Sequence, residues 1–249
     1  MTAVLELRGL CKSFGALAVT RDVWLSLPPN ELHALIGPNG AGKTSLIGQI
    51  TGTLAPDAGE VHLCGRNITH LPGHRRARLG LARSFQVTAL VGGFSALENV
   101  ALSVQGRSRH SLRPFGRAAN EAALNDPARA ALRTVGLADR AHVPAAELAH
   151  GEQRLLELAC ALAGEPRCLV LDEPLAGMGL AEAGKVVDLL RQLKARFTIL
   201  LVEHDLDAVF ALADRISVLI GGRIAATDEP AHIRADPVLR AAYLGDALE

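Results

Sequence analysis

The stretch GPNGAGKT, from Gly37 to Thr44, decides the fold that this sequence predicts. It matches the pattern GxxxxGK[ST] and lies between a predicted strand, Glu31–Ile36, and a predicted helix, Lys43–Thr51. Glycines in the loop allow backbone torsions that point successive N–H groups into one concavity. The start of the helix adds partial positive charge that faces the same concavity. The stretch therefore predicts a strand–loop–helix unit that cradles the phosphates of a nucleotide.

Two side chains of this loop carry distinct chemistry. The Lys43 ammonium places a point charge between the β- and γ-phosphates, and the Thr44 hydroxyl is a candidate ligand of Mg²⁺. The residues of the loop that are predicted to contact the nucleotide are Gly37, Pro38, Asn39, Gly40, Ala41, Gly42, Lys43 and Thr44.

An acidic pair ends a second apolar strand in CLVLDEP, residues 168–174. Side chains alternate along a strand, so Asp172 and Glu173 point in different directions. Ligands of open α/β sheets bind at the carboxyl ends of the strands, which makes an acidic pair at that place a candidate site. We assign Asp172 to the metal, directly or through water, and Glu173 to the water that attacks the γ-phosphate.

Apolar runs rich in Val, Ile and Leu alternate with helical patterns along the rest of the chain. The predicted strands are Val4–Leu7, Ala18–Leu27, Glu31–Ile36, Glu60–Leu63, Leu81–Phe85, Cys168–Leu171, Thr198–Val202 and Arg215–Ile220. The predicted helices are Lys43–Thr51, Ser95–Ser103, Asp126–Val135, Gly151–Ala163, Ala181–Ala195, Leu206–Ala213 and Pro237–Leu244. Strands as apolar as LVL (169–171) indicate a mainly parallel sheet covered on both faces. The sequence predicts an α/β fold in which a helical subdomain, about residues 89–164, is inserted into a core formed by about residues 1–88 and 165–249.

Composition narrows the class of protein further. The chain has 249 residues, with 26 basic and 26 acidic side chains, which excludes disorder and argues against a bulk nucleic-acid binder. No apolar run approaches the length that spans a bilayer, and Glu6 and Arg8 interrupt the N-terminus where a signal peptide would be apolar. We therefore expect a cytoplasmic protein. The cysteines show no metal-ligand spacing, and we expect reduced core residues at Cys11, Cys64, Cys160 and Cys168.

Four further sites follow in a recognisable order. Gln86 ends the segment LARSFQ, LAHGEQ (148–153) opens a helix, AGMG (176–179) follows the acidic pair, and His204 ends ILLVEH. This set resembles the ATP-binding subunit of ABC transporters, and the resemblance covers the whole chain. It implies a RecA-like P-loop NTPase fold with an antiparallel β edge. Within that superfamily the chain resembles the ATPases of branched-chain amino acid importers, on the segments DEPLAGMG (172–179), VEHDLDAVF (202–210) and IRADPVLRAAYLG (233–245).

The resemblance implies further site residues. Phe14 would stack on the adenine of ATP, although an ordinary core aromatic is the alternative. Gln86 would sense Mg²⁺ and the attacking water at the hinge to the helical subdomain, and His204 would contact the γ-phosphate and orient Glu173. In the family, ATP held by one subunit is capped by the LSGGQ-like segment of another, and here Ala149 and Gly151 would supply that cap.

The chain departs from the family pattern at two places. Ala149 stands where the family usually has Ser, and His150 replaces a Gly. Gly179 stands where many relatives have Asp. These departures leave open a subunit that closes more weakly on ATP, or a nucleotide-gated subunit that hydrolyses slowly.

The resemblance also implies partners. We expect a homodimer or a heterodimer with a homologous ATPase, on the inner face of the cell membrane, bound to permease subunits and indirectly to a periplasmic substrate-binding protein. The segment 89–97 would dock a permease helix, or would pack on its own core. The Arg-rich segment 106–117 is read as a solvated loop, with contact to a partner or to lipid phosphates as the alternative.

The sequence leaves several functional classes of ATPase open. The first expectation is an ATPase that energises the import of branched-chain or other hydrophobic amino acids. Alternatives are the import of urea or amides, lipopolysaccharide-type export, and a soluble ABC ATPase that acts on nucleic acid or translation.

Overall fold

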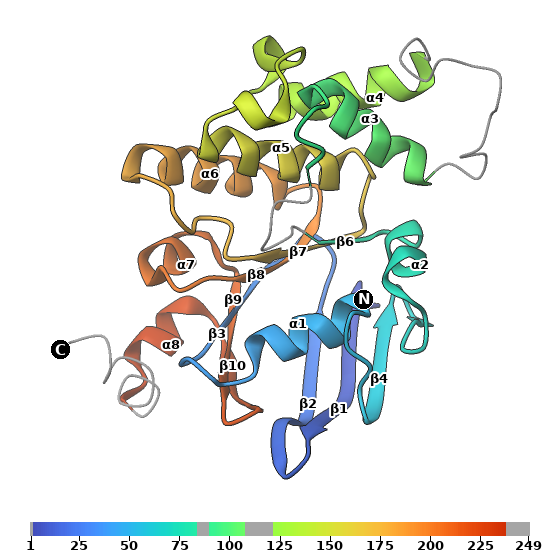
Figure 1. The fold of residues 1–249 in the computed structure, drawn as a ribbon. Helices are drawn as coiled ribbons and strands as arrows, with labels where there is room; N and C mark the ends of the chain where they lie inside the picture. Colours follow the sequence, from blue (N-terminus) through green and yellow to red (C-terminus); the bar gives the residue numbers. More distant parts are fainter. Residues whose placement is uncertain (1, 84–89, 108–121, 238–249) are drawn as a thin grey trace.

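The computed structural model describes residues 2–83, 90–107 and 122–237. Figure 1 shows two sheets with helices packed around them. The smaller sheet has the antiparallel order β2 (Leu17–Leu27), β1 (Leu5–Phe14), β4 (Ala58–Leu63) and β5 (Arg66–Asn67). The larger sheet has the order β10 (Arg223–Asp228), β9 (Arg215–Ile220), β3 (Leu32–Ile36), β8 (Thr198–Val202), β7 (Cys168–Asp172) and β6 (Leu81–Arg83).

The larger sheet is parallel except at its β10 edge. Its central strands β3, β7 and β8 are buried along their whole length, which agrees with their mostly apolar sequences. The predicted mainly parallel sheet is therefore confirmed. Leu35 of β3 and Asp172 of β7 both pair with Val202 of β8, so the carboxyl ends of these three strands lie side by side.

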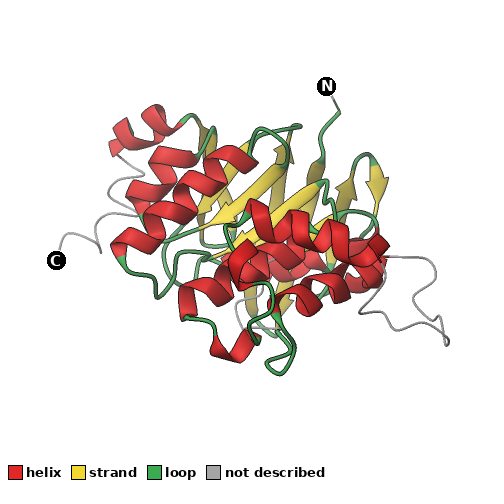
Figure 2. Cartoon of the chain, turned by 90° about the horizontal axis from the view of Figure 1, so that it is seen from above, coloured by secondary structure: helices red, strands yellow, loops and turns green. Residues whose placement is uncertain are grey.

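The two faces of the larger sheet belong to different apolar clusters. Along β7, Leu169 and Leu171 join one cluster, while Cys168 and Val170 join the other. The first cluster contains side chains from α3 (Ala96–Arg107), α4 (Ala122–Thr134), α5 (His150–Leu162) and α6 (Leu180–Leu193). The second contains α1 (Lys43–Thr51) and the smaller sheet. Figure 2 shows the helices gathered along one side of the strands. The division of the chain near residues 88 and 164 stays a prediction.

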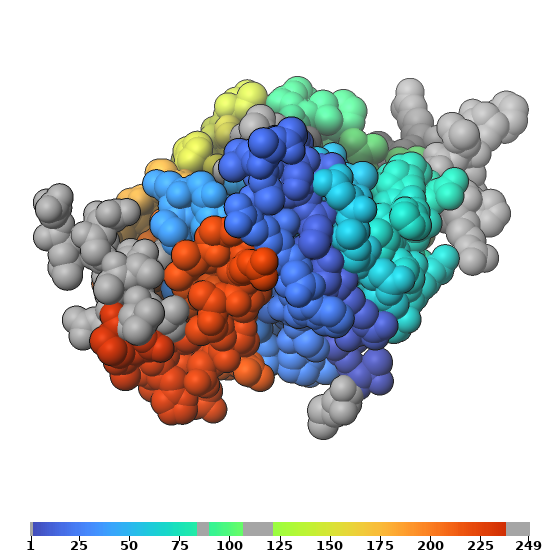
Figure 3. Space-filling view, turned by 90° about the horizontal axis from the view of Figure 1, so that it is seen from below, coloured from blue at the N-terminus to red at the C-terminus, as the bar shows by residue number. Residues whose placement is uncertain are grey.

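Strand β2 of the smaller sheet lies against β10 of the larger one, and Figure 3 shows the blue N-terminal part of the chain beside the orange-red part. The backbone N–H of Arg21 in β2 donates to the carbonyl oxygen of Gly222 at 2.7 Å. Gly222 N–H in turn donates to the carbonyl oxygen of Ala41 at 3.0 Å, so β2 lies beside the loop that follows β3. Strand β2 therefore forms one wall of the predicted phosphate site.

Several elements differ from the sequence-based expectation. The first strand is longer than predicted, and the predicted strand Leu81–Phe85 is described only as far as Arg83. The sequence analysis missed β5, β10, α2 (Gly73–Arg78) and α8 (Pro230–Ala235). These are short and mostly exposed, so they lack the apolar periodicity that predicts an element. The predicted helix Pro237–Leu244 lies outside the described residues except for Pro237.

The N-terminus of α3 lies where the local sequence predicts it. A capping box begins α3 next to the predicted start at Ser95, because Ser95 N–H donates to Glu98 Oε2 at 2.8 Å and Glu98 N–H donates to Ser95 Oγ at 3.2 Å. In the described ranges, none of the helices has the length and apolar character needed to cross a bilayer.

A buried arginine contacts the C-terminal end of α1, the helix that follows the predicted phosphate-binding loop Gly37–Thr44 (the phosphate loop). Arg76 is only 2% exposed and donates to the carbonyl oxygens of Gln49 and Ile50 in α1 at 2.6 Å each. It also donates to the carbonyl oxygens of Thr69 and Leu71. A cation at a helix C-terminus interacts favourably with the helix dipole, so Arg76 anchors the helix that presents Lys43 and Thr44.

Replacing Arg76 by methionine is expected to lower the free energy of unfolding by about 3 kcal/mol, because buried carbonyl oxygens lose their donor. Urea unfolding followed by circular dichroism measures the change. Arg78→Met is the matched control, since Arg78 lies on the same helix but is exposed. Equal midpoints for the two variants would contradict this role of Arg76.

Candidate functional site

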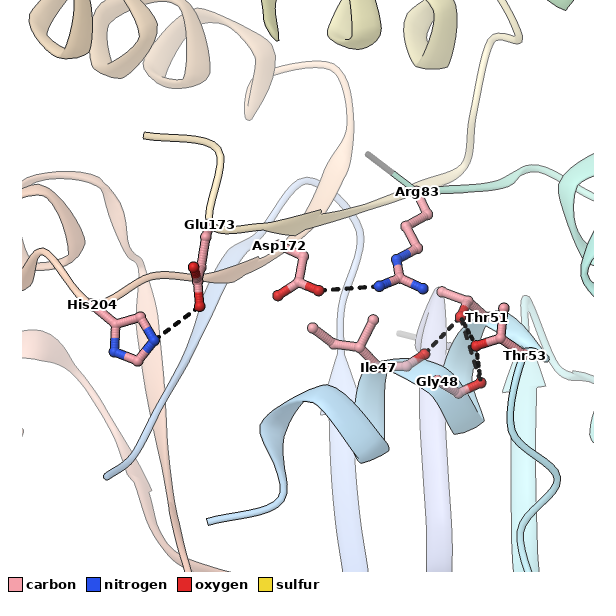
Figure 4. Close-up of polar contacts among 8 residues, drawn as sticks. All are labelled: Ile47, Gly48, Thr51, Thr53, Arg83, Asp172, Glu173 and His204. Carbon is pink, nitrogen blue, oxygen red and sulfur yellow. Dashed lines mark hydrogen bonds and ion pairs between the residues drawn. The ribbon is translucent and has the colours of Figure 1, made fainter. Parts of the chain in front are cut away.

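The predicted phosphate-loop, Asp172, Glu173 and His204 positions gather at the carboxyl ends of parallel strands. The phosphate loop follows β3, Asp172 ends β7, and His204 follows β8. Figure 4 shows Asp172, Glu173 and His204 along this edge, above α1. Because these strands are neighbours in the sheet, residues far apart in the sequence meet at one place.

Two glycines of the phosphate loop have no room for a side chain. A Cβ at Gly37 would overlap the carbonyl oxygen of Leu219, and a Cβ at Gly42 would overlap that of Val19. Gly42 also has φ of 105°, in the region that favours glycine. The loop is thus clamped between β2 and β9, and its backbone N–H groups are held in one arrangement.

Lys43 lies inside this loop. Its side chain is buried and its ammonium donates to the carbonyl oxygens of Gly37 and Pro38. Burial lowers the pKa of Lys43, while the nearby carboxylates of Glu173 and Asp172 act in the opposite direction. An ammonium has three donors, so Lys43 can exchange a carbonyl for a phosphate oxygen without leaving the loop.

Asp172 is the most buried of the predicted site carboxylates. Its side chain is 2% exposed, and its Oδ2 accepts from Arg83 at 3.1 Å. Burial raises the pKa of Asp172, and the Arg83 guanidinium partly offsets this. A buried carboxylate at a strand end is an oxygen ligand of the kind that Mg²⁺ prefers.

Glu173 and His204 form a hydrogen-bonded pair, with 2.9 Å between Glu173 Oε1 and His204 Nε2. Both side chains are partly exposed, so solvent water reaches the carboxylate. Glu173 has φ of 51°, which is uncommon for a residue with a Cβ, and its N–H donates to the carbonyl oxygen of Val202 at 2.8 Å. Such strain is found at functional sites, where it re-aims a side chain.

The sequence analysis missed Glu203, which organises this pair. Glu203 is 3% exposed and accepts from the backbone N–H of Leu175 at 2.8 Å and of His204 at 3.0 Å. Burial raises the pKa of Glu203, and its backbone donors lower it. The carboxylate therefore ties the segment after β7 to the segment after β8. The signal in the sequence was an acid directly after the apolar strand ILLV.

The remaining predicted residues lie in several places. Phe14 ends β1 and is 53% exposed, with the Lys12 ammonium 5.6 Å from its ring centre, so it is not a core aromatic. Thr44 is exposed on the first turn of α1. Gln86 lies outside the described residues.

The segment LAHGEQ does not lie beside the phosphate loop of the same chain. Ala149 and Gly151 begin α5, which packs in the apolar cluster on the face opposite α1. There a Cβ on Gly151 would lie 3.0 Å from the carboxyl carbon of Glu182. His150 lies beside Gly177 in the loop after the acidic pair.

The residues present fit a nucleotide phosphate with Mg²⁺. Close packing of Gly37 and Gly42 against the neighbouring strands fixes the loop backbone, and Asp172 and Thr44 offer oxygen ligands. Mg²⁺ is usually bound by one or two carboxylates together with substrate phosphates. In the part of the chain that the structure describes, no three His, Cys, Asp or Glu side chains gather as a metal site of their own.

Comparison with known proteins places the chain. The family model described as ABC transporter matches residues 20–176. The chain is 37% identical over 252 residues to the high-affinity branched-chain amino acid transport ATP-binding protein LivG of Escherichia coli K12, with 98% of both chains covered. It is 34% identical over 251 residues to the lipopolysaccharide export system ATP-binding protein LptB of Acidithiobacillus ferridurans, with 100% of both covered.

A solved structure agrees with these relatives. The crystal structure of a nucleotide-free ATP-binding cassette from an ABC transporter matches with a TM-score of 0.85 at 28% identity, covering 97% of this chain and 99% of that chain. The predicted P-loop NTPase fold is thereby confirmed. With a family model over more than half of the chain and a 37% identical relative over nearly all of it, the chain belongs to the ABC transporter ATP-binding family.

Proposed function

We propose that this chain binds and hydrolyses ATP to energise an ABC importer of branched-chain or other hydrophobic amino acids. The observation that carries the hydrolytic part is the Glu173–His204 pair, 2.9 Å apart, in the same strand-end site as Lys43 and Asp172. The likeness to LivG over 98% of both chains supports the cargo.

Each residue has a task that follows from its position. The loop N–H groups and Lys43 bind the triphosphate, while Thr44 and Asp172 would hold Mg²⁺. When bound, Mg²⁺ neutralises negative charge on the phosphates. Glu173 accepts the proton of the attacking water at its carboxylate, and His204 Nε2 holds that carboxylate in place. Gln86 is proposed to contact the same water.

The chain acts as a dimer in this proposal. The start of α5 and the phosphate loop belong to opposite faces of one sheet, so LAHGEQ reaches a nucleotide only on a second ATPase subunit. Leu180, which directly follows the AGMG loop, is 96% exposed. A large apolar side chain in that position is suited to a subunit interface.

Replacing Ala149 by serine is expected to tighten ATP-driven dimerisation at least about tenfold, because a hydroxyl donor to an anionic phosphate is worth roughly 1.5–3 kcal/mol. Sedimentation with ATP and a Glu173→Gln background measures it. The backbone N–H of Ala149 already donates to Glu152 Oε2 at 3.0 Å, so serine also completes a capping box and stabilises the isolated subunit.

Ala149→Asp separates the two effects. Aspartate also caps α5, but its negative charge repels the phosphate. The proposal expects both variants to raise the melting temperature and only Ala149→Ser to tighten the dimer. Equal dimerisation of Ala149→Ser and the wild type would contradict the proposal that this segment contacts the ATP bound by the other subunit.

A cavity of about 520 Å³ offers a docking site for the permease. It lies between α2, α3 and β6, and its apolar lining includes Leu90, Val91 and Leu102. Val91 and Leu102 are 40% and 47% exposed. We propose that a permease helix occupies this cavity and holds the subunit on the inner face of the membrane.

Co-purification tests the transport part. The chain, co-expressed with permease subunits of a branched-chain amino acid importer, is expected to be retained with them in detergent. Its ATP hydrolysis is then expected to be stimulated by the periplasmic binding protein. Val91→Asp with Leu102→Asp should lose the permeases yet still bind ATP. Retention unaffected by these substitutions would contradict docking in the cavity.

Lipopolysaccharide-type export is the second candidate, favoured by the 34% identity to LptB over the whole chain. Association with export permeases in the same experiment would decide for it.

A further inference from the structure

Arg83 and Asp172 lie on neighbouring strands of the larger sheet. Arg83 is the last residue of β6 and pairs in register with Val170 of β7, two residues before Asp172. Arg83 Nη2 is 3.1 Å from Asp172 Oδ2, and the two side chains are 18% and 2% exposed. The Arg83 guanidinium is therefore a direct counter-charge to the buried Asp172 carboxylate.

The pairing leaves the guanidinium incompletely bonded. An arginine–carboxylate pair is frequently bidentate, and here Arg83 donates to Asp172 Oδ2 through Nη2. Arg83 Nε is buried and has no hydrogen-bond partner in the part of the chain that the structure describes. A buried donor without a partner is costly, so the present contact does not satisfy the whole side chain.

Arg83 also faces a second environment. It lines the 520 Å³ cavity together with Leu90, Val91 and Glu157. Glu157 on α5 is buried and paired with Arg154 at 3.2 Å. The guanidinium thus lies between the carboxylate proposed to hold Mg²⁺ and the cavity proposed to hold the permease.

We infer that Arg83 is a built-in counter-ion of Asp172 that Mg²⁺ displaces, so that metal loading turns the guanidinium toward the cavity. This rests on the proposed function, since it needs a metal at Asp172. Two cations compete for one carboxylate, and their mutual repulsion makes joint occupancy unfavourable. Arg83 is a positioning residue, and it couples the metal site to the docking cavity through a single side chain.

The alternative is that Arg83 only holds Asp172 in place. The two roles predict opposite changes in metal affinity. Removing a competitor tightens metal binding, whereas removing a support weakens it. Metal affinity is therefore the decisive measurement, and it does not depend on turnover.

The test uses Mn²⁺ as the probe, with a non-hydrolysable ATP analogue and the full chain. Electron paramagnetic resonance counts free Mn²⁺ during titration. Arg83→Gln is expected to bind Mn²⁺ about tenfold more tightly than the wild type, and Arg83→Lys, which keeps the charge, to fall between them. Arg191→Gln is the control, because Arg191 forms an exposed pair with Asp188 at 2.7 Å on α6, and it should change nothing.

A second measurement works on the wild type, and it decides the case if Arg83→Gln fails to fold. The Nε–Hε resonance of Arg83, assigned from its loss in Arg83→Lys, should shift when Mg²⁺ is added with the analogue. Affinity that is unchanged or weaker in the variants, or an unmoved resonance, overturns the inference alone. A wild type that binds no Mn²⁺ with the analogue overturns the proposed function and this inference with it.

Discussion

Replacing Glu173 by glutamine is expected to reduce ATP hydrolysis by roughly 10²–10⁴-fold, because an amide oxygen does not accept the proton of the attacking water. ATP binding should persist, since the phosphate loop is untouched. The neutral amide still hydrogen-bonds to His204, which lies 2.9 Å from Glu173 in the wild type. Phosphate release measures hydrolysis, and calorimetry with Mg²⁺ and ATP measures binding.

The chain provides a matched control in Glu165. This glutamate is exposed, and its φ of 44° lies in the same left-handed region as that of Glu173. Glu165→Gln therefore repeats the chemical change on a similar backbone away from the site, and it should hydrolyse ATP normally. Hydrolysis by Glu173→Gln at more than a tenth of the wild-type rate would remove Glu173 as the general base.

Replacing Lys43 by alanine is expected to weaken ATP binding by about 100-fold or more, because the loop loses its only ammonium at the phosphates. The wild type should gain thermal stability in the presence of ATP and Mg²⁺, as any protein does whose folded state binds a ligand. Lys43→Ala should lose that gain. Calorimetric titration and thermal unfolding with and without ATP provide the two readings.

Lys43→Met and Lys185→Ala control this experiment. Lys43 is buried and holds the carbonyl oxygens of Gly37 and Pro38, so methionine keeps the volume while removing the charge. Lys185 is an exposed lysine on α6. We expect methionine to behave like alanine in binding and Lys185→Ala like the wild type. Wild-type ATP affinity in both Lys43 variants would contradict the nucleotide site itself.

The parts of the fold that could be predicted are those whose secondary structure is determined by nearby residues in the sequence. GPNGAGKT between an apolar run and a helical pattern predicts its own strand, loop and helix, and LVL (169–171) predicts a strand buried on both faces. The elements α2, α8 and β10 were missed, because they are short and exposed. Their place is set by contacts such as the backbone bonds of Arg76, which no local pattern contains.

The sequence by itself determined which side chains are the candidates for the chemistry of this protein. The glycines, Lys43, Asp172, Glu173 and His204 are recognisable by type and spacing, because each stands at a strand end or a helix start. Only the tertiary structure decided which of these groups meet. The order of the strands brings Glu173 to His204 and Asp172 to Arg83, and it places the start of α5 on the face opposite α1. Pairing between strands far apart in the chain is governed by packing of both sheet faces, and that information is spread over the whole sequence.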